Sequence, residues 1–320
     1  MKLAYVFPGQ ASQYVGMGKD LWDRYPQVKE HYQLTNEILG MDITQLSFQG
    51  PEEKLVQTDN TQPAIFAHSL ALYLLLKEHG LVPHMVAGHS LGEYSALVAA
   101  GSLTYQETLR LVQLRGRLMK EAGQNRPGTM AAIIGLSARQ IEELCARVDQ
   151  VVQLANHNSP AQLVISGEVA GVQRAMELAK EAGAKRAVQL PVSGAFHSPL
   201  MEDARERLAE ALNSAPFEAP EIPLVANVTA REVEGVDQVR ELLMRQLTSP
   251  VLWSDSMERM AEMGAEVFVE VGPGKVLRGL MRRILPDART LGVGGVESLE
   301  AALADLQGGM RSSRPTEDQT

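Results

Sequence analysis

The chain has 320 residues, 45% of them hydrophobic, which is enough to bury the core of one large domain or two modest ones. Its formal net charge is −9, so it lacks the surplus of Lys and Arg that binding to nucleic acid or an anionic membrane requires. No apolar run reaches membrane-spanning length, and the single cysteine, Cys145, excludes an internal disulfide and a cysteine-rich metal site. We therefore expect a cytoplasmic protein with no nucleic-acid or membrane partner.

Hydrophobic periodicity and turn residues predict alternating strands and helices in the first 124 residues. We expect strands over residues 3–7 and 81–87 and helices over residues 19–39, 64–76 and 104–122.

A second pattern fills residues 125–191, where predicted elements follow the order βαββαβ. The strands cover 130–136, 151–156, 162–167 and 185–191, and the helices cover 137–148 and 169–182. This order is that of a ferredoxin-like unit, so we predict a small subdomain inserted into a larger one.

The rest of the chain, residues 192–307, returns to the larger subdomain. Here we expect helices over 200–214, 236–247, 253–263 and 276–284, and strands over 224–228 and 266–271. Residues 308–320 are polar and carry Gly, Ser and Pro, which predicts a disordered tail.

The most informative stretch is Gly88-His89-Ser90-Leu91-Gly92, which follows an apolar run and precedes a helix-forming segment. Strand, sharp turn and helix are the context of a serine nucleophile in an α/β-hydrolase-like sheet. Such a turn strains the backbone, and only small residues two before and two after the serine permit it. The pentapeptide alone is weak evidence, so other residues must decide.

A serine hydroxyl needs a base within hydrogen-bond reach. Of the seven histidines, His197 lies in a loop of small residues between the last predicted strand of the insert and a helix, where the two subdomains meet. His89 adjoins Ser90, but a neighbouring residue at such a turn points away from the nucleophile. His197 is therefore the candidate base.

Taken together, these features resemble the malonyl-CoA:acyl carrier protein transacylases and the acyltransferase domains of polyketide synthases. The resemblance runs from about residue 3 to residue 285, and its order of motifs is highly specific. The matching segments are FPGQ at 7–10, TQP at 61–63, GHSLGEYSA at 88–96, LRGRLM at 114–119, GTMAA at 128–132, NSP at 158–160, GAFHS at 194–198 and EVGPGK at 270–275.

The resemblance implies an α/β fold with an α/β-hydrolase-like large subdomain, and it implies roles for five residues. Ser90 would take malonyl from coenzyme A as an acyl-serine ester, and His197 would move the protons. The main-chain carbonyl of Gln246 would orient His197 in place of an aspartate. The backbone N–H groups of Gln10 and Leu91 would meet the oxyanion.

The same resemblance implies the residues that bind substrate. Arg115 would bind the malonyl carboxylate through two parallel charge-assisted bonds, and Gln62 and Asn158 would line the acyl pocket. Phe196 would leave little room for an α-methyl branch and so reject methylmalonyl. The chain departs from the family at Ala11, where glycine is common, and a positive φ there would strain the oxyanion loop.

These roles imply a ping-pong transfer of malonyl to the phosphopantetheine thiol of an acyl carrier protein, for fatty-acid or polyketide synthesis. They require no metal and no cofactor beyond coenzyme A thioester and carrier, and we expect a monomer.

Two basic clusters could bind an acidic carrier, although a solvated surface is the commoner role of such clusters. They are Arg278, Arg282 and Arg283, and Lys180, Lys185 and Arg186.

Two other functions remain open from the sequence. A serine esterase or thioesterase of α/β-hydrolase type shares the serine turn, but it usually carries an acid between the serine and the histidine and has no obvious use for Arg115. A non-catalytic carrier-docking protein could keep the fold, although the presence of Ser90, His197 and Arg115 together makes this the weakest alternative.

Overall fold

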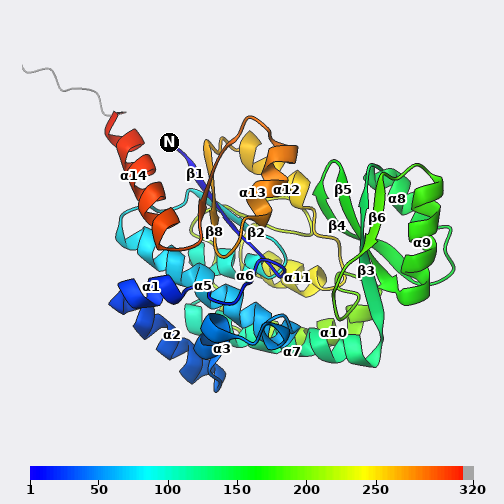
Figure 1. Cartoon of the computed structure of the whole chain (residues 1–320), viewed down its shortest axis with the longest axis horizontal. Helices are drawn as coiled ribbons and strands as arrows, with labels where there is room; N and C mark the ends of the chain where they lie inside the picture. Colours follow the sequence, from blue (N-terminus) through cyan, green and yellow to red (C-terminus); the bar gives the residue numbers. More distant parts are fainter. Residues whose placement is uncertain (313–320) are drawn as a thin grey trace, which may run out of the picture.

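The computed structural model describes residues 1–312, which contain two β-sheets (Figure 1). The larger sheet has five parallel strands in the order β7-β2-β1-β8-β9, and the smaller has four antiparallel strands in the order β4-β5-β3-β6. The strands are β1 (Leu3–Phe7), β2 (Met85–Gly88), β3 (Gly128–Ile134), β4 (Val152–Ser159), β5 (Gln162–Glu168), β6 (Arg186–Gln189), β7 (Leu224–Val225), β8 (Val267–Val271) and β9 (Arg289–Val293).

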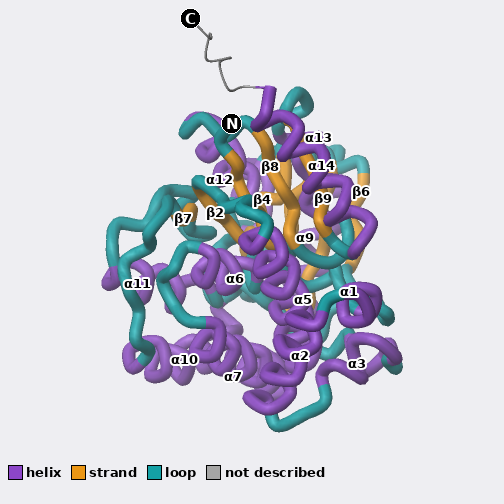
Figure 2. The backbone as a smooth tube through the Cα atoms, turned by 90° about the vertical axis from the view of Figure 1, so that its left-hand side faces the viewer, coloured by secondary structure: helices purple, strands orange, loops and turns teal. Residues whose placement is uncertain are grey.

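Helices cover both faces of the larger sheet and one face of the smaller sheet (Figures 1 and 2). In chain order they are α1 (Lys19–Arg24), α2 (Pro26–Leu39), α3 (Ile43–Gln49), α4 (Glu52–Leu55), α5 (Thr58–Glu78), α6 (Gly92–Ala99), α7 (Tyr105–Asn125), α8 (Ala138–Cys145), α9 (Val169–Glu181), the 3₁₀ turn η1 (Pro199–Met201), α10 (Glu202–Ser214), α11 (Val236–Gln246), α12 (Trp253–Glu262), α13 (Val276–Ile284) and α14 (Val296–Ser312).

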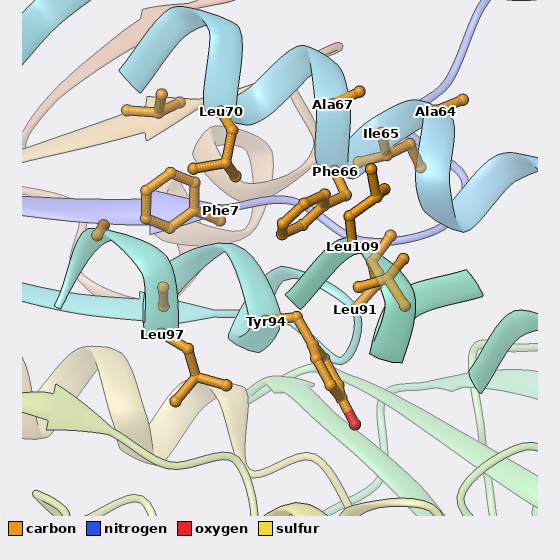
Figure 3. Packing of buried hydrophobic residues seen from close by; sticks show 14 of the residues in the cluster. Phe7, Ala64, Ile65, Phe66, Ala67, Leu70, Leu91, Tyr94, Leu97 and Leu109 are labelled. Carbon is orange, nitrogen blue, oxygen red and sulfur yellow. The ribbon is translucent and has the colours of Figure 1, made fainter. Parts of the chain in front are cut away.

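The parallel sheet is the middle of three layers. Successive side chains of a strand point to opposite faces, so Ala4 and Val6 of β1 pack toward α12 and α13, while Tyr5 and Phe7 pack toward α5 and α6. Figure 3 shows the Phe7 ring between Leu70 of α5 and side chains of α6. Because both faces are covered, β1 and β8 are buried along their whole length, and Glu270 of β8 is the only charged residue in these two strands.

The antiparallel sheet has one covered face and one face that meets the larger part of the chain. Ala131 and Ile133 of β3 pack against α8 and α9 in a separate core. Their neighbours Met130 and Ala132 point the other way and line a cavity beside the parallel sheet. Alternation along β3 thus gives the small sheet its core on one side and one wall of a site on the other.

Several predicted elements differ from the structure for identifiable reasons. The predicted helix over 19–39 is wrong in one respect: it is split at Tyr25, which is extended because Pro26 begins α2. Helix α5 begins at Thr58, six residues before the predicted start, and contains Pro63 as its sixth residue, where the proline has no N–H to donate to the carbonyl four residues before it.

Four elements were not predicted: α3, α4, β9 and α14. Helix α4 is only 4 residues long, so it has no hydrophobic periodicity from which to predict it. Helix α14 continues to Ser312, so residues 308–312 are helical and the prediction of disorder is wrong for them; the rest of the predicted tail, residues 313–320, lies outside the described part of the chain.

Within residues 1–312, no helix is long and apolar enough to cross a membrane. In the same residues, no three His, Cys, Asp or Glu side chains gather so that they could hold a metal ion.

Candidate active site

The serine motif forms the turn between β2 and α6. Ser90 has a φ of 51°, a left-handed conformation that is costly for a residue with a side chain. A Cβ at Gly88 would lie 1.9 Å from the backbone of Gly92, and a Cβ at Gly92 would lie 2.0 Å from the carbonyl oxygen of Phe7. The backbone segments at this turn therefore lie too close together for any side chain at position 88 or 92. This confirms that small residues are needed two before and two after the serine.

Ser90 and His197 meet although 107 residues separate them. The Ser90 hydroxyl lies 2.8 Å from Nε2 of His197, and Nδ1 of His197 lies 2.8 Å from the main-chain oxygen of Gln246. A carbonyl oxygen can only accept, so Nδ1 carries the proton and Nε2 is free to accept one from the serine. His197 also has a positive φ, 58°, so both partners are held in uncommon backbone conformations.

The electrostatics of His197 suit a base. Burial and, to a smaller extent, the positive charge of Arg115 lower the pKa of His197 to about 3. The imidazole is therefore neutral near pH 7 and can accept the serine proton.

Two backbone amides beside Ser90 have no acceptor in the part of the chain that the structure describes. Among the described residues, no hydrogen bond joins the N–H of Gln10 or of Leu91 to a protein oxygen. The N–H of Ser90 itself is occupied, since it donates to Oδ1 of Asn227 at 2.7 Å. Gln10 and Leu91 both line the cavity at Ser90, which is the position expected of oxyanion donors.

The loop that carries Gln10 adopts the conformation anticipated for position 11. Ala11 has a φ of 80°, a region that favours glycine, so the alanine is strained there. The loop is held by two local hydrogen bonds, from Ala11 N to Oε1 of Gln13 at 2.9 Å and from the Ser12 hydroxyl to the Gly9 oxygen at 2.7 Å. These bonds offset the strain and keep the Gln10 amide in place.

Arg115 comes from α7 and is only 1% exposed, unlike Arg110 and Arg117 of the same helix, whose side chains are mostly in solvent. Its NH1 donates to Oε1 of Gln62 at 2.7 Å. Its NH2 donates to the Ser90 hydroxyl at 3.0 Å and to Oε1 of Gln246 at 2.9 Å. A cation is thus held directly beside the hydroxyl, where it can bind an anionic group of a substrate.

The Arg115 guanidinium also faces the Tyr94 ring, with its central carbon 5.5 Å from the ring centroid. Burial lowers the pKa of Arg115, while Tyr94 and Glu93 act in the opposite direction. Because an arginine keeps its proton over the whole range in which proteins are folded, this remains a buried positive charge.

The cavity at Ser90 lies between the two sheets and has a volume of about 270 Å³. Phe196, next to the base in sequence, is 6% exposed and lines it. Asn158 of β4 lines it too, with Oδ1 lying 2.8 Å from Nε2 of His89. His89 therefore turns toward Asn158 and away from Ser90, as expected. All nine residues that the sequence proposed for the site lie at this cavity or, for Gln246, directly behind it.

Sequence reasoning missed three contributions to the site. Asn227 fixes the serine turn, since its amide accepts from the N–H of Ser90 and donates to the oxygen of Gly88 at 2.6 Å. Glu93 is buried beneath the turn, and the side chain of Gln246 adds to the main-chain role that was expected. A buried acid on an apolar helix was a usable signal for Glu93, whereas Asn227 has no local signature.

The α/β fold and a cavity in which a serine–histidine pair adjoins a buried arginine place the chain in the class of proteins that have the groups acyl transfer requires. The model of the acyl transferase domain matches residues 4–297. A malonyl CoA-acyl carrier protein transacylase of Bacillus subtilis is 42% identical over 309 residues, which cover 96% of this chain and 98% of the relative. One from Escherichia coli is 46% identical, with 94% and 99% covered. The chain belongs to the malonyl CoA-acyl carrier protein transacylase family.

Solved structures agree with the sequence relatives. An acyl carrier protein S-malonyltransferase from Vibrio cholerae has a TM-score of 0.91 at 45% identity, with 94% of this chain and all of that chain covered. A malonyl-transacylase solved with its type II polyketide synthase acyl-carrier protein has a TM-score of 0.92 at 42% identity, with 95% and 100% covered. The mixed α/β fold, with one parallel and one antiparallel sheet, is therefore that of this family.

Proposed function

We propose that the chain transfers malonyl from malonyl-CoA to the phosphopantetheine thiol of an acyl carrier protein, for fatty-acid or polyketide synthesis. The observation that carries the proposal is one cavity in which the Ser90–His197 pair adjoins the buried cation of Arg115. The pair supplies acyl transfer, and the cation supplies a reason to prefer an acyl group that ends in a carboxylate.

In the first half-reaction, the Ser90 oxygen attacks the thioester carbon while its proton passes to Nε2 of His197. The carbonyl oxygen gains the negative charge, and the N–H groups of Gln10 and Leu91 donate to it. The carbon–sulfur bond then breaks, the proton on His197 goes to the departing coenzyme A thiolate, and malonyl remains as an ester of Ser90.

In the second half-reaction, the thiol of the carrier's phosphopantetheine arm takes the place of coenzyme A. His197 removes the thiol proton, the thiolate attacks the ester, and the Ser90 oxygen leaves with a proton returned from His197. Throughout, the Gln246 carbonyl holds the imidazole in one tautomer. The proposed steps use no metal ion and no redox cofactor.

Substrate choice follows from two walls of the cavity. Arg115 would hold the malonyl carboxylate, and its guanidinium is steadied by Gln62 at 2.7 Å, while Asn158 of the small sheet lines the same cavity. The ring of Phe196 fills space near His197, so a methyl branch on the malonyl carbon would meet it. We therefore propose that methylmalonyl is a poor substrate.

The carrier would dock over α13. Leu277 and Leu280 of this helix line the cavity, and Arg283 NH1 donates to Oε1 of Gln162 at its rim. Of the three arginines on α13, Arg278 lies 3.5 Å from the buried Glu270, which leaves Arg282 and Arg283 for an acidic partner. The other basic cluster lies at α9 and β6, away from the cavity lining, so it is the weaker candidate (Figure 1).

The proposal also covers the location and oligomeric state of the protein and the division of its chain into subdomains. We infer a cytoplasmic monomer, because Cys145 is a buried free thiol and the exposed large apolar side chains of residues 1–308 are scattered among several elements. We divide the chain into an α/β-hydrolase-like subdomain, residues 1–124 and 192–307, and a ferredoxin-like subdomain, residues 125–191. The strand order β4-β5-β3-β6 with two helices on one face supports that division.

A thioesterase is the main competitor, since it would share the acyl-serine step and release malonate to water. The use of a main-chain carbonyl behind His197 and the arginine beside Ser90 favour transfer. Incubation with malonyl-CoA, with and without phosphopantetheinylated carrier, separates the two. We expect malonyl-carrier to form much faster than free malonate, whereas rapid malonate release without carrier acylation would refute transfer.

A further inference from the structure

Glu93 is a buried acid that the proposed reaction does not use. It lies in the first turn of α6, three residues after Ser90, and is 2% exposed. Within the described residues, no lysine or arginine forms a salt bridge or hydrogen bond with its carboxylate. Instead, Oε2 accepts from the side-chain amide of Gln246 at 2.5 Å, and Oε1 accepts from the N–H of Asn227 at 3.4 Å. Because burying a carboxylate costs free energy, we expect Glu93 to contribute something to the site that offsets this cost.

The side-chain amide of Gln246 bonds to two acceptors and to one donor. Its Nε2 donates to Glu93 and to the carbonyl oxygen of Ser90, at 3.0 Å in the latter case. Its Oε1 accepts from NH2 of Arg115 at 2.9 Å. Turning the amide over would set its oxygen against two acceptors and its NH₂ group against a guanidinium. The acceptor groups of Glu93 and Ser90 thus select one orientation.

We propose that Glu93 is a positioning residue for malonyl selectivity: it fixes the orientation of the Gln246 amide, and that amide fixes the Arg115 guanidinium beside Ser90. The inference rests on the proposed function, because it concerns the site that would hold the malonyl carboxylate. It gives Gln246 two connected roles, with the main chain holding His197 and the side chain holding Arg115.

The charges support the same arrangement. Glu93 and Arg115 are opposite charges joined through one amide, and each favours the charged state of the other. Burial nevertheless raises the pKa of Glu93 to about 7. A neutral Glu93 would still accept from Gln246, so the orientation requires an acceptor oxygen and not the full negative charge.

The test compares acylation of Ser90 by malonyl-CoA and by acetyl-CoA, because both use the same serine and histidine. Glu93→Ala removes the acceptor, and we expect the malonyl-to-acetyl ratio of kcat/KM to fall about tenfold. Glu93→Gln keeps an acceptor oxygen and should restore the ratio to within about threefold of wild type. Ser95→Ala, at another buried position of α6 whose hydroxyl has no partner among the described residues, should keep the wild-type ratio.

A merely structural role for Glu93 would lower both rates together. An unchanged ratio in Glu93→Ala, or an equal loss of ratio in Glu93→Gln, would overturn the proposal. In an Arg115→Ala background, Glu93→Ala should leave the ratio unchanged, since the residue through which Glu93 acts is then absent. A further drop in that background would also overturn it.

A second measurement does not depend on activity. Urea unfolding of wild type, Glu93→Ala, Arg115→Ala and the double variant gives the coupling between the two positions. We expect the double variant to be clearly more stable than the sum of the single losses predicts, because each single variant leaves the other charge buried. Strict additivity would overturn the link through Gln246 even if malonyl transfer holds, whereas a wild type without malonyl transfer would instead refute the proposed function.

Discussion

Replacing Arg115 by alanine removes the cation beside Ser90, and the size of the expected loss follows from its contacts. A carboxylate held by two N–H groups gains two charge-assisted bonds, each worth roughly 1.5–3 kcal/mol. In the free protein, however, NH1 is already bonded to Gln62 and NH2 to Gln246 and Ser90, so part of this gain is an exchange of partners. We therefore expect a net loss of about 3 kcal/mol for malonyl, roughly 100-fold in kcat/KM.

The assay is single-turnover acylation of Ser90 by malonyl-CoA and acetyl-CoA. Acetyl lacks the carboxylate, so it should lose much less, and the ratio of the two losses isolates the carboxylate contact. Arg110→Ala is the matched control, since Arg110 lies on the same helix, is mostly exposed and pairs with Glu107. Equal losses on both acyl groups in Arg115→Ala would refute the reasoning and leave Arg115 a structural residue of the cavity.

Three further predictions concern the base, the oxyanion loop and the acyl pocket. His197 accepts a proton only when neutral, and its pKa is lowered from 6.5 to about 3, so Ser90 acylation should persist as the pH falls to about 5; a half-loss near 6.5 in a pH–rate profile would contradict this. Ala11→Gly should raise the free energy of unfolding in urea by up to about 1 kcal/mol, because φ there is positive, and destabilisation would show that the alanine is not strained. Phe196→Ala should raise the methylmalonyl-to-malonyl rate ratio about tenfold. An unchanged ratio would show that Phe196 does not exclude the methyl branch sterically.

Local signals in the sequence predicted most of the elements that carry the site. The strand over residues 3–7 was placed correctly because an apolar run of strand length ends there at Pro8-Gly9. The helix that begins at Val276 was placed correctly because its apolar residues recur at helical spacing. The terminal elements β9 and α14 were missed. Strand β9 has an exposed or half-buried pattern except at Val293, so it lacks the periodicity that marks a buried strand.

The site was predictable only in part. The distance between Ser90 and His197 in the sequence conceals their contact. The position of His197 in a loop of small residues made it the candidate base, and the resemblance to a family supported the pair. The glycine spacing did have a local physical reason, the close backbone approach at Gly88 and Gly92. The roles of Asn227 and of the Gln246 side chain depend on tertiary contacts with the serine turn, and the residues near them in the sequence do not predict such contacts.

The acyl-serine intermediate is the central claim, and intact mass measurement tests it most directly. Brief exposure to malonyl-CoA should add the mass of one malonyl group, peptide mapping should place it on Ser90, and addition of phosphopantetheinylated carrier should move it to the carrier thiol. Ser90→Ala should show no adduct. A carrier that becomes malonylated by Ser90→Ala at the wild-type rate, or an adduct on any other residue, would contradict the account.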